Sequence, residues 1–306
     1  MARTVFELCA GAGGQAIGFE EAGFQHVGLI DSDPHACATL RLNRPYWNVL
    51  EADITRFAAN YWNGVDVVAA GLPCPPFSVA GHQLGNGDER NLFPAFLRIV
   101  SEIAPRAIVV ENVRGLLSRK FDSYRGAIEN EFGSLGFKLQ WQLLNALDHG
   151  VPQYRARSFL VGLREKREFR WPSKNGRSET VGEALGAMMA ANGWRGADEW
   201  AKRANRPAPT LVGGSKKHGG PDLGPTRARQ AWAELGVDGL GVANAPPEPD
   251  FTGNPRLTVE MTSRLQSFPP DWTLAGSKTQ RYRQVGNALP PKLASAVARS
   301  VLQCLG

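Results

Sequence analysis

The residue in this sequence best suited to nucleophilic chemistry is Cys74. It lies in the segment 73–78, Pro-Cys-Pro-Pro-Phe-Ser, directly after an apolar run at residues 65–70. Proline fixes its own φ and restricts the residue before it, so flanking prolines hold the cysteine on a stiff turn and present its thiol. A presented thiol suits a nucleophile, and a cysteine kept only for the shape of a loop is the alternative on these residues alone.

A carboxylate and two arginines follow other apolar runs. Glu111 ends the run at 107–110, and since the carboxyl ends of parallel strands share one sheet edge, it would lie near Cys74. Such a pair can attack and protonate one substrate, although a strand-end glutamate can also make only a surface hydrogen bond. Gln153, Arg155 and Arg157 alternate along the sequence. An extended chain would put all three on one face, either binding anions and carbonyl oxygens or lying on a solvated edge strand.

A glycine-rich turn is the third chemical feature. Residues 10–14 read Ala-Gly-Ala-Gly-Gly between a strand pattern and a helix pattern, and Asp31 ends the next strand pattern. Glycines let a ligand approach a helix N-terminus, and a carboxylate about twenty residues further on can accept from ribose hydroxyls. The spacing is not that of a dinucleotide site. It indicates an adenosine-like cofactor without saying which one, and close packing of strand on helix is the alternative.

The elements that must position these residues alternate between strand and helix patterns. Short β-branched runs predict strands at 4–9, 26–31, 49–52, 65–70 and 107–111, and a hairpin-like pair at 138–145 and 157–163. Apolar residues at helical spacing predict helices at 93–103 and 124–135. This alternation predicts an α/β fold with a doubly wound, mostly parallel Rossmann-like sheet.

The sequence changes in character after about Trp171. Gly and Pro become frequent, and only two short helices are expected, at 180–191 and 226–235, before a regular pattern resumes at Arg256. A second, smaller and irregular domain is therefore predicted. A last helix with Pro290 and Pro291 in its first turn is expected to return to the sheet.

Charge indicates the kind of partner. The 306 residues are 42% hydrophobic, enough for a packed core, and carry a formal net charge of +6. Residues 164–229 hold 14 Lys and Arg against 7 Asp and Glu, whereas residues 1–163 hold 14 against 16. A basic segment next to near-neutral ones is what a phosphate-contacting surface needs, so nucleic acid is the expected partner, with a merely solvated face as the alternative.

The sequence predicts neither a membrane span nor a disulfide framework or metal site. No apolar stretch approaches the length of a membrane span and no leader is seen, so we expect an intracellular protein. The cysteines lie far apart, without a Cys-x-x-Cys or Cys/His cluster, which predicts neither a disulfide framework nor a metal site.

Taken together, these residues closely resemble the DNA (cytosine-5) methyltransferase family. The matching motifs follow the family order over nearly the whole chain: 8–14, 73–78, 111–113, 153–157, 256–258 with 266–269, and 284–290. Cys9 stands where the family usually has phenylalanine, Asp31 where glutamate is common and Pro75 where glutamine is frequent. None of these departures removes a group that the chemistry requires.

The resemblance implies a division of the chain into domains. Residues 1–171 with 281–306 would form the catalytic and cofactor-binding domain, 172–255 the target-recognition domain that reads DNA, and 256–280 a hinge between them. The basic segment falls where the family reads DNA.

The resemblance also implies a role for each site residue. Cys74 would attack C6 of a cytosine flipped out of duplex DNA, Glu111 would hydrogen-bond or protonate N3, and Arg155 and Arg157 would bear on the base carbonyl and a nearby phosphate. C5 would then take the methyl group of S-adenosyl-L-methionine, and loss of the C5 proton would free the cysteine. The residues expected to bind the cofactor are Leu8, Ala10, Gly11, Gly13, Gly14, Asp31, Ser32, Asp53, Ile54, Pro73, Leu92, Asn287 and Ala288. Those expected to contact DNA are Ser78, Gln153, Lys216 and Lys217, and residues 79–88 are expected to close over the flipped base.

Two alternatives stay open: a tRNA cytosine-5 methyltransferase of the same family, and a catalytically silent DNA-binding protein of this fold. The long basic segment favours DNA, and the intact cysteine, glutamate and arginines favour an enzyme. The expected partner is double-stranded DNA, met in the cytoplasm at the nucleoid, with no membrane and no metal. A cognate restriction endonuclease acting on the same site is implied by the family alone.

Overall fold

The computed structural model describes residues 2–73, 91–164, 167–174, 177–213 and 221–306. The chain forms two compact units, the first made of Met1–Leu144, Ala156–Ser173 and Ala294–Gly306, and the second of Asn145–Arg155 and Lys174–Leu293. Residues 145–155 and 281–293, which we expected in the catalytic domain, and the expected hinge at 256–280 therefore lie in the second unit. The functional division of the chain stays a prediction.

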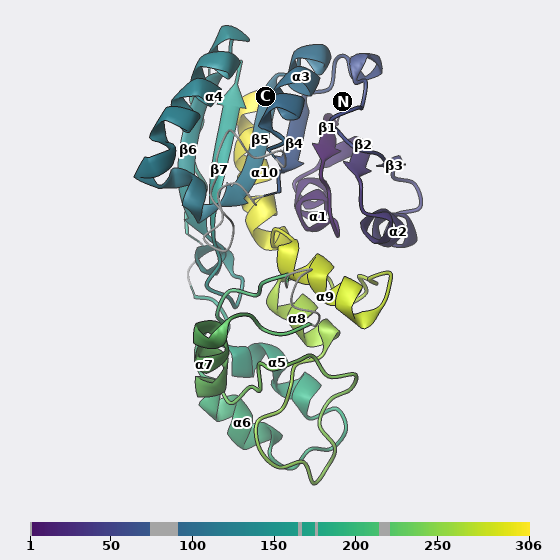
Figure 1. Ribbon diagram of the computed structural model, residues 1–306, viewed down its shortest axis with the longest axis vertical. Helices are drawn as coiled ribbons and strands as arrows, with labels where there is room; N and C mark the ends of the chain where they lie inside the picture. The colour runs from purple at the N-terminus through teal and green to yellow at the C-terminus, as the bar shows by residue number, and fades with distance from the viewer. Residues whose placement is uncertain (1, 74–90, 165–166, 175–176, 214–220) are drawn as a thin grey trace. The chain divides into compact units, whose positions relative to one another are not determined.

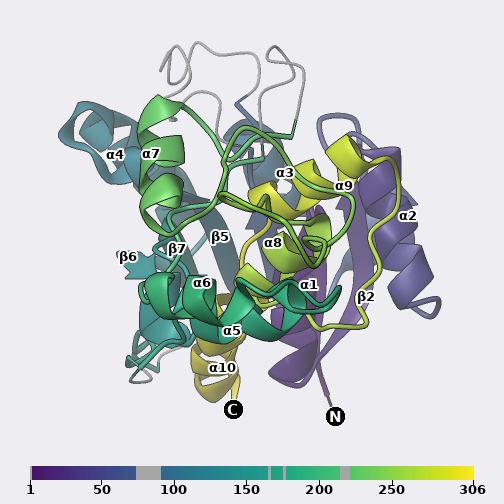
Figure 2. The ribbon, with the colours of Figure 1, turned by 90° about the horizontal axis from the view of Figure 1, so that it is seen from below.

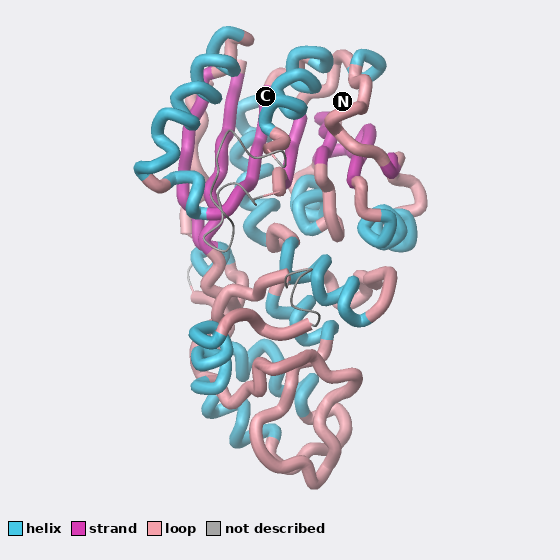
Figure 3. The backbone as a smooth tube through the Cα atoms, viewed as in Figure 1, coloured by secondary structure: helices cyan, strands magenta, loops and turns pink. Residues whose placement is uncertain are grey.

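A seven-stranded sheet forms the centre of the first unit, as the β-branched runs predict (Figures 1 and 3). The strand order is β3-β2-β1-β4-β5-β7-β6. The strands are β1 (Arg3–Leu8), β2 (Phe24–Asp31), β3 (Val49–Glu51), β4 (Val67–Gly71), β5 (Ala107–Val113), β6 (Lys138–Asn145) and β7 (Ala156–Leu163). Neighbours from β3 to β5 pair in parallel, and β7 is antiparallel to β5. The predicted Rossmann-like α/β fold is confirmed.

The helices of the first unit cover this sheet. They are α1 (Gly14–Glu21), α2 (Pro34–Asn43), α3 (Phe93–Ile103), α4 (Asp122–Ser134) and most of α10 (Pro291–Leu305), with short 3-10 turns η1 (Asn60–Trp62), η3 (Arg114–Leu117) and η4 (Arg119–Phe121). The strands β4 and β5 are buried along almost their whole length. Because residues 67–70 and 107–110 are all apolar and buried, the core fixes the carboxyl ends of both strands, and the polar residues at those ends have a defined place.

The second unit consists of helices joined by long loops (Figure 3). Its helices are η5 (Ala146–His149), α5 (Val181–Met189), α6 (Ala197–Arg203), α7 (Thr226–Glu234), α8 (Val259–Leu265) and α9 (Lys278–Asn287). Figure 2 shows α5 and α6 side by side, and the contact is so close that a Cβ on Gly182 would lie 1.9 Å from the Ala201 carbonyl oxygen. This unit has its own apolar core around Trp232 and Tyr282. In the part of the chain that the structure describes, no helix is long and apolar enough to span a membrane.

Candidate active site

Glu111 lies beside the residue at which β4 ends. In the parallel register of β4 and β5, Glu111 pairs with Gly71. A Cβ on Gly71 would lie 3.9 Å from Glu111 Oε2 and 3.4 Å from the Cys9 carbonyl oxygen, both ordinary van der Waals distances, so the Glu111 carboxylate directly adjoins this residue. The next residue of β5, Asn112, donates from Nδ2 to the Leu72 carbonyl at 3.3 Å. Two side chains of β5 thus contact the chain where it leaves β4: Glu111 adjoins Gly71, and Asn112 bonds to Leu72.

An ion pair with Arg157 holds the Glu111 carboxylate. Arg157 Nε lies 2.9 Å from Glu111 Oε1, and the two side chains are only 14% and 9% exposed. Arg157 also donates from Nη1 to the Ala156 carbonyl at 2.9 Å. The Ser158 hydroxyl, which donates to the Val113 carbonyl at 2.9 Å, fastens β7 to β5 at the same place. A shielded guanidinium therefore orients the carboxylate at the carboxyl end of β5.

Arg155 is engaged by main-chain carbonyls of the second unit. It is fully buried and donates to the Leu211 oxygen at 2.7 Å and to the Gly286 and Ala288 oxygens at 2.8 Å each. A guanidinium held in this way positions the backbone on either side of Asn287, and its complete burial leaves it out of reach of a base carbonyl or phosphate in this conformation. The expectation that Arg155 contacts the base stays a prediction.

Gln153 belongs to the same buried network. Its amide donates to Gln266 Oε1 at 2.8 Å and accepts from the Leu211 N–H at 2.9 Å, and Gln266 in turn donates to the Val285 carbonyl at 2.7 Å. Both glutamine side chains are fully buried. We expected Gln153 to contact DNA, whereas in this structure its amide is used to hold the protein's own backbone.

Two glycines let the network close. A Cβ on Gly286 would lie 2.5 Å from the Gly213 nitrogen, and a Cβ on Gly213 would lie 1.9 Å from Asn287 Oδ1. Backbone therefore packs on backbone next to Asn287 and Ala288, two residues that we expected at the cofactor.

The glycine-rich turn joins β1 to α1 in a left-handed conformation. Gly11 has φ +54° with nothing within 4 Å of a built Cβ, and Gly13, at φ 86°, precedes α1 without any side-chain hydrogen bond to cap the helix. The N–H of Gly11 donates to Asp31 Oδ2 at 2.7 Å, and that of Asp33 donates to Oδ1 at 2.8 Å. Burial raises the pKa of Asp31, while the N–H donors oppose that rise.

This turn fits a nucleoside cofactor that carries a carboxylate. Each oxygen of Asp31 has a second lone pair with which it can accept from a ribose hydroxyl. The uncapped N-terminus of α1 provides N–H donors and a positive dipole end for an anionic group. Open space beside Gly11 lets such a ligand reach the backbone.

The other residues expected at the cofactor are placed in different ways. The side chains of Leu8 and Ile54 lie in the hydrophobic core, so only their main chain could meet a ligand. Asp53 is exposed, and hydrogen bonds from the Thr55 N–H and hydroxyl, at 2.9 and 2.8 Å, lower its pKa. Ala10 is buried, Ser32 and Pro73 are exposed, and Leu92 is half-buried directly before α3. The residues Cys74, Ser78, Lys216 and Lys217, and the expected lid at 79–88, lie outside the described residues.

Gln15 is a buried polar residue next to the glycine-rich turn, and it was not among the site residues expected from the sequence. It lies in the first turn of α1 and is 4% exposed, and neither atom of its amide has a hydrogen-bond partner in the described chain. The available signal was its position, a polar side chain directly after Gly13 and Gly14 in a helix whose first six residues are all buried.

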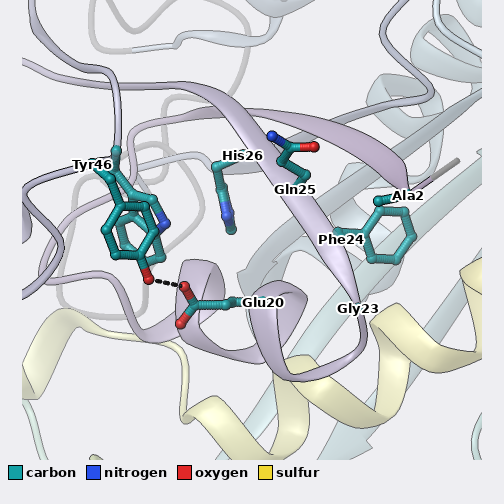
Figure 4. A pocket seen from close by; sticks show the side chains of 8 residues that line it. Ala2, Glu20, Gly23, Phe24, Gln25, His26 and Tyr46 are labelled. Carbon is teal, nitrogen blue, oxygen red and sulfur yellow. Dashed lines mark hydrogen bonds between the residues drawn. The ribbon is translucent and has the colours of Figure 1, made fainter.

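A cavity of about 290 Å³ lies elsewhere, at the amino end of β2. Figure 4 shows its lining, where the Tyr46 hydroxyl donates to Glu20 Oε1 at 2.8 Å. Because it opens at the end of the strand opposite Asp31, it is not part of the candidate active site. The described residues contain no group of three His, Cys, Asp or Glu side chains able to hold a metal ion.

Comparison with known proteins shows relatives that match along nearly the whole chain. Residues 3–303 match a family model described as C-5 cytosine-specific DNA methylase. The chain is 49% identical over 309 residues to Type II methyltransferase M.NaeI of Lentzea aerocolonigenes, an alignment that covers 98% of this chain and 75% of that protein. It is 48% identical over 308 residues to Type II methyltransferase M.NgoMIV of Neisseria gonorrhoeae, covering 99% and 98%.

Solved structures share the fold. The Entamoeba histolytica methyltransferase EhMeth superposes with a TM-score of 0.69 at 13% identity, covering 100% of this chain and 99% of that one. The S. pombe Dnmt2 methyltransferase superposes with a TM-score of 0.65 at 18% identity, covering 99% of each chain.

Proposed function

This chain belongs to the C-5 cytosine-specific DNA methylase family, and on that premise we propose that it methylates C5 of a cytosine flipped out of a specific duplex DNA sequence, through a covalent bond between Cys74 and C6. The observation that carries the proposal is the ion pair of Glu111 and Arg157 beside Gly71. Cys74 follows Gly71 by three residues. The strand register therefore places a fixed carboxylate beside the residue three positions before the proposed nucleophile.

The proposed chemistry begins at the thiol. Cytosine C5 is a poor nucleophile, and addition of the Cys74 thiolate to C6 delivers electron density to it. Glu111 acts on N3 in its protonated form: it donates a hydrogen bond, or transfers its proton, to the nitrogen as negative charge develops there, and Arg157 keeps the side chain in place. After methylation, removal of the C5 proton lets the sulfur–C6 bond break, which restores both the aromatic ring and the free cysteine.

We propose S-adenosyl-L-methionine as the cofactor; when bound, it supplies an electrophilic methyl group. The glycine turn at 11–14 and Asp31 would hold it. The other residues proposed to bind it are Ser32, Asp53, Pro73, Leu92, Asn287 and Ala288. The main-chain N–H groups of this turn and the carboxylate lone pairs of Asp31 carry the fit.

The biological setting follows from the relatives. Both bacterial proteins that share about half of this sequence are named Type II methyltransferases. We therefore propose that this enzyme is the modification half of a restriction-modification system. Ser78, Lys216 and Lys217 are proposed DNA contacts, and a nuclease that cuts the same sequence is the proposed partner.

A labelling experiment tests the activity. The protein is incubated with S-adenosylmethionine labelled in its methyl group and with either duplex DNA from a host without cytosine methylation or total tRNA. We expect label in DNA as 5-methylcytosine and none in tRNA. Label in tRNA alone would overturn the DNA assignment and support the tRNA alternative, and no label in either would support the silent one.

A trapping experiment tests the covalent step. Duplex DNA carrying 5-fluorocytosine cannot lose a proton from C5, so the adduct should persist as a denaturation-resistant complex. Cys74→Ser should abolish this complex, whereas Cys304→Ser, at a buried cysteine of α10, should keep it. An equal yield of complex with both variants would sink the proposed nucleophile.

A further inference from the structure

Three cationic side chains directly after β5 have no carboxylate partner among the residues that the structure describes. Arg114, Arg119 and Lys120 lie on η3 and η4, directly after β5, and all three are exposed. Within the described part of the chain, none of them makes an ion pair, and the one contact of Lys120 is with the Phe121 ring, 4.9 Å from its centroid. Residues 114–120 are called the basic turn below.

The basic turn is a fixed structure. Leu116 is fully buried and Phe121 is 5% exposed, so one apolar anchor lies within the turn and a second directly follows it. Arg125 of α4 donates to the Leu116 and Ser118 carbonyls, at 2.6 and 3.1 Å, and braces the loop between the anchors. The carboxylates on either side in sequence are already paired, Glu111 with Arg157 and Asp122 with Arg125, so no carboxylate of the described residues neutralises the charges of the turn.

The basic turn is also continuous with the candidate active site. Arg114 is three residues beyond Glu111, which is about 10 Å at the rise of a β-strand. The Ser158 hydroxyl fastens the intervening Val113 to β7, next to Arg157. One strand of DNA carries a phosphate about every 3.4 Å along the helix axis, so a nucleotide held at Glu111 has neighbouring phosphates within that range.

We propose that the basic turn is a phosphate-contact surface, which binds the nucleic-acid backbone a few nucleotides from the target base. This inference rests on the proposed function, and it adds a surface of the first unit to the DNA contacts proposed from the sequence. Three exposed cations on a rigid seven-residue turn match a polyanion better than a single small anion, because no side chain closes around any one of them. The contacts position the backbone and carry no information on base sequence.

The test is the salt dependence of binding. Arg119→Gln with Lys120→Gln removes two charges that make no ion pair, so the fold should be kept. The control, Lys138→Gln with Arg299→Gln, removes two exposed charges elsewhere in the unit. Lys138 begins β6 at the sheet edge away from Glu111, since its neighbour Leu139 packs against Gly162 and Ile108. Binding to a labelled duplex is measured over a range of salt concentrations, with methylation kinetics on the same DNA.

We expect the log–log salt slope of the basic-turn variant to be less steep by about two, since each lost phosphate contact changes it by about 0.9. KM for DNA should rise about tenfold near physiological salt with kcat at saturating DNA unchanged, because Glu111 and Arg157 are intact. The control should match the wild type. A variant slope equal to the wild-type slope, or an equal loss in the control, would refute the surface.

The same data separate this inference from the proposed function. A wild-type protein that binds DNA with a salt slope reduced in the variant, but methylates no DNA, would overturn the activity and leave the surface supported. A wild-type protein that methylates DNA with an unchanged variant slope would do the reverse. Failure of the wild type to bind any duplex would overturn both.

Discussion

At the scale of single residues, the Glu111 carboxylate matters for both its charge and its position. Glu111→Gln keeps the size of the side chain and a hydrogen-bonding group, but it removes the ion pair with Arg157 and cannot protonate N3. We predict that single-turnover methylation slows by about 10² to 10⁴, the usual contribution of a general acid. Glu131→Gln, an exposed change on α4, is the control and should leave the rate unaltered. A Glu111→Gln variant that methylates at the wild-type single-turnover rate would show that Glu111 takes no part in the reaction.

Replacing Gln15 is expected to leave the stability of the protein unchanged or to increase it. Its buried amide has no hydrogen-bond partner in the described chain, and an unpartnered polar group in the interior costs about 1–3 kcal/mol. Gln15→Leu should therefore leave the free energy of unfolding equal to that of the wild type or raise it by about 1 kcal/mol. Urea unfolding measures this. A loss of 2 kcal/mol or more would mean that the amide has a partner in solution.

At the scale of elements, Arg155 joins segments that are far apart in sequence. Its guanidinium meets carbonyls of residues 211, 286 and 288, and a lysine ammonium cannot reach all three in one geometry. Arg155→Lys should lower the free energy of unfolding by about 2–4 kcal/mol, because buried carbonyls lose their donors. The matched change Arg195→Lys, at a pair with Asp250 in which both side chains are 79% exposed, should cost less than about 0.5 kcal/mol. Similar losses in both would contradict the bracing role.

Gln153 and Gln266 should behave as one unit. Their amides bond to each other at 2.8 Å, and each also holds a backbone segment. A double-mutant cycle with Gln153→Ala and Gln266→Ala should give a coupling energy of about 0.5–3 kcal/mol, as expected for buried residues of one hydrogen-bond network. Additive effects would show that the two side chains act independently.

Local patterns made most elements of the first unit predictable. The helix α3 occupies the predicted 93–103, and α4, at Asp122–Ser134, lies within two residues of the predicted 124–135 at each end. The helix α2 was missed because its buried face has only one large apolar residue, Leu40, beside the small or polar Ala36, Cys37 and Thr39. Tertiary packing against the sheet, rather than an apolar stripe, holds it in place.

The candidate site was predictable only in part. The end of the apolar run at 107–110 predicted that Glu111 lies at the carboxyl end of a strand. Alternation in sequence suggested that Gln153, Arg155 and Arg157 share a face. That pattern could not show that the first two bond to main chain as far away as residues 265 and 288, because side-chain to main-chain bonds over such separations leave no periodic trace. Of these three side chains, Arg157 is the one for which the structure shows an ion pair with Glu111.

At the scale of the whole molecule, Asp66 links the two ends of the chain within the first unit. It accepts from the Thr4 N–H at 2.9 Å and pairs with Arg3 and Arg106 at 3.3 and 3.0 Å. Both arginines also donate to the Leu305 carbonyl, at 2.8 and 2.9 Å. One carboxylate thus organises two cations that hold the C-terminal end of α10 against β1.

The titration of Asp66 makes this link sensitive to pH. Burial alone would raise the pKa of Asp66, but the hydrogen bonds from Thr4 and Arg106 outweigh it and lower the pKa below its ordinary value. A depressed folded pKa contributes stability that is present above the unfolded value of about 3.9 and is lost as the pH falls through the folded value. Asp66→Asn should therefore reduce the urea midpoint at neutral pH, and its deficit relative to wild type should shrink once the pH falls below about 4. Asp250→Asn, at an exposed pair, should show no such convergence. A deficit of Asp66→Asn that stays constant down to the acid transition would mean that the lost packing, and not the charge, joins the two ends.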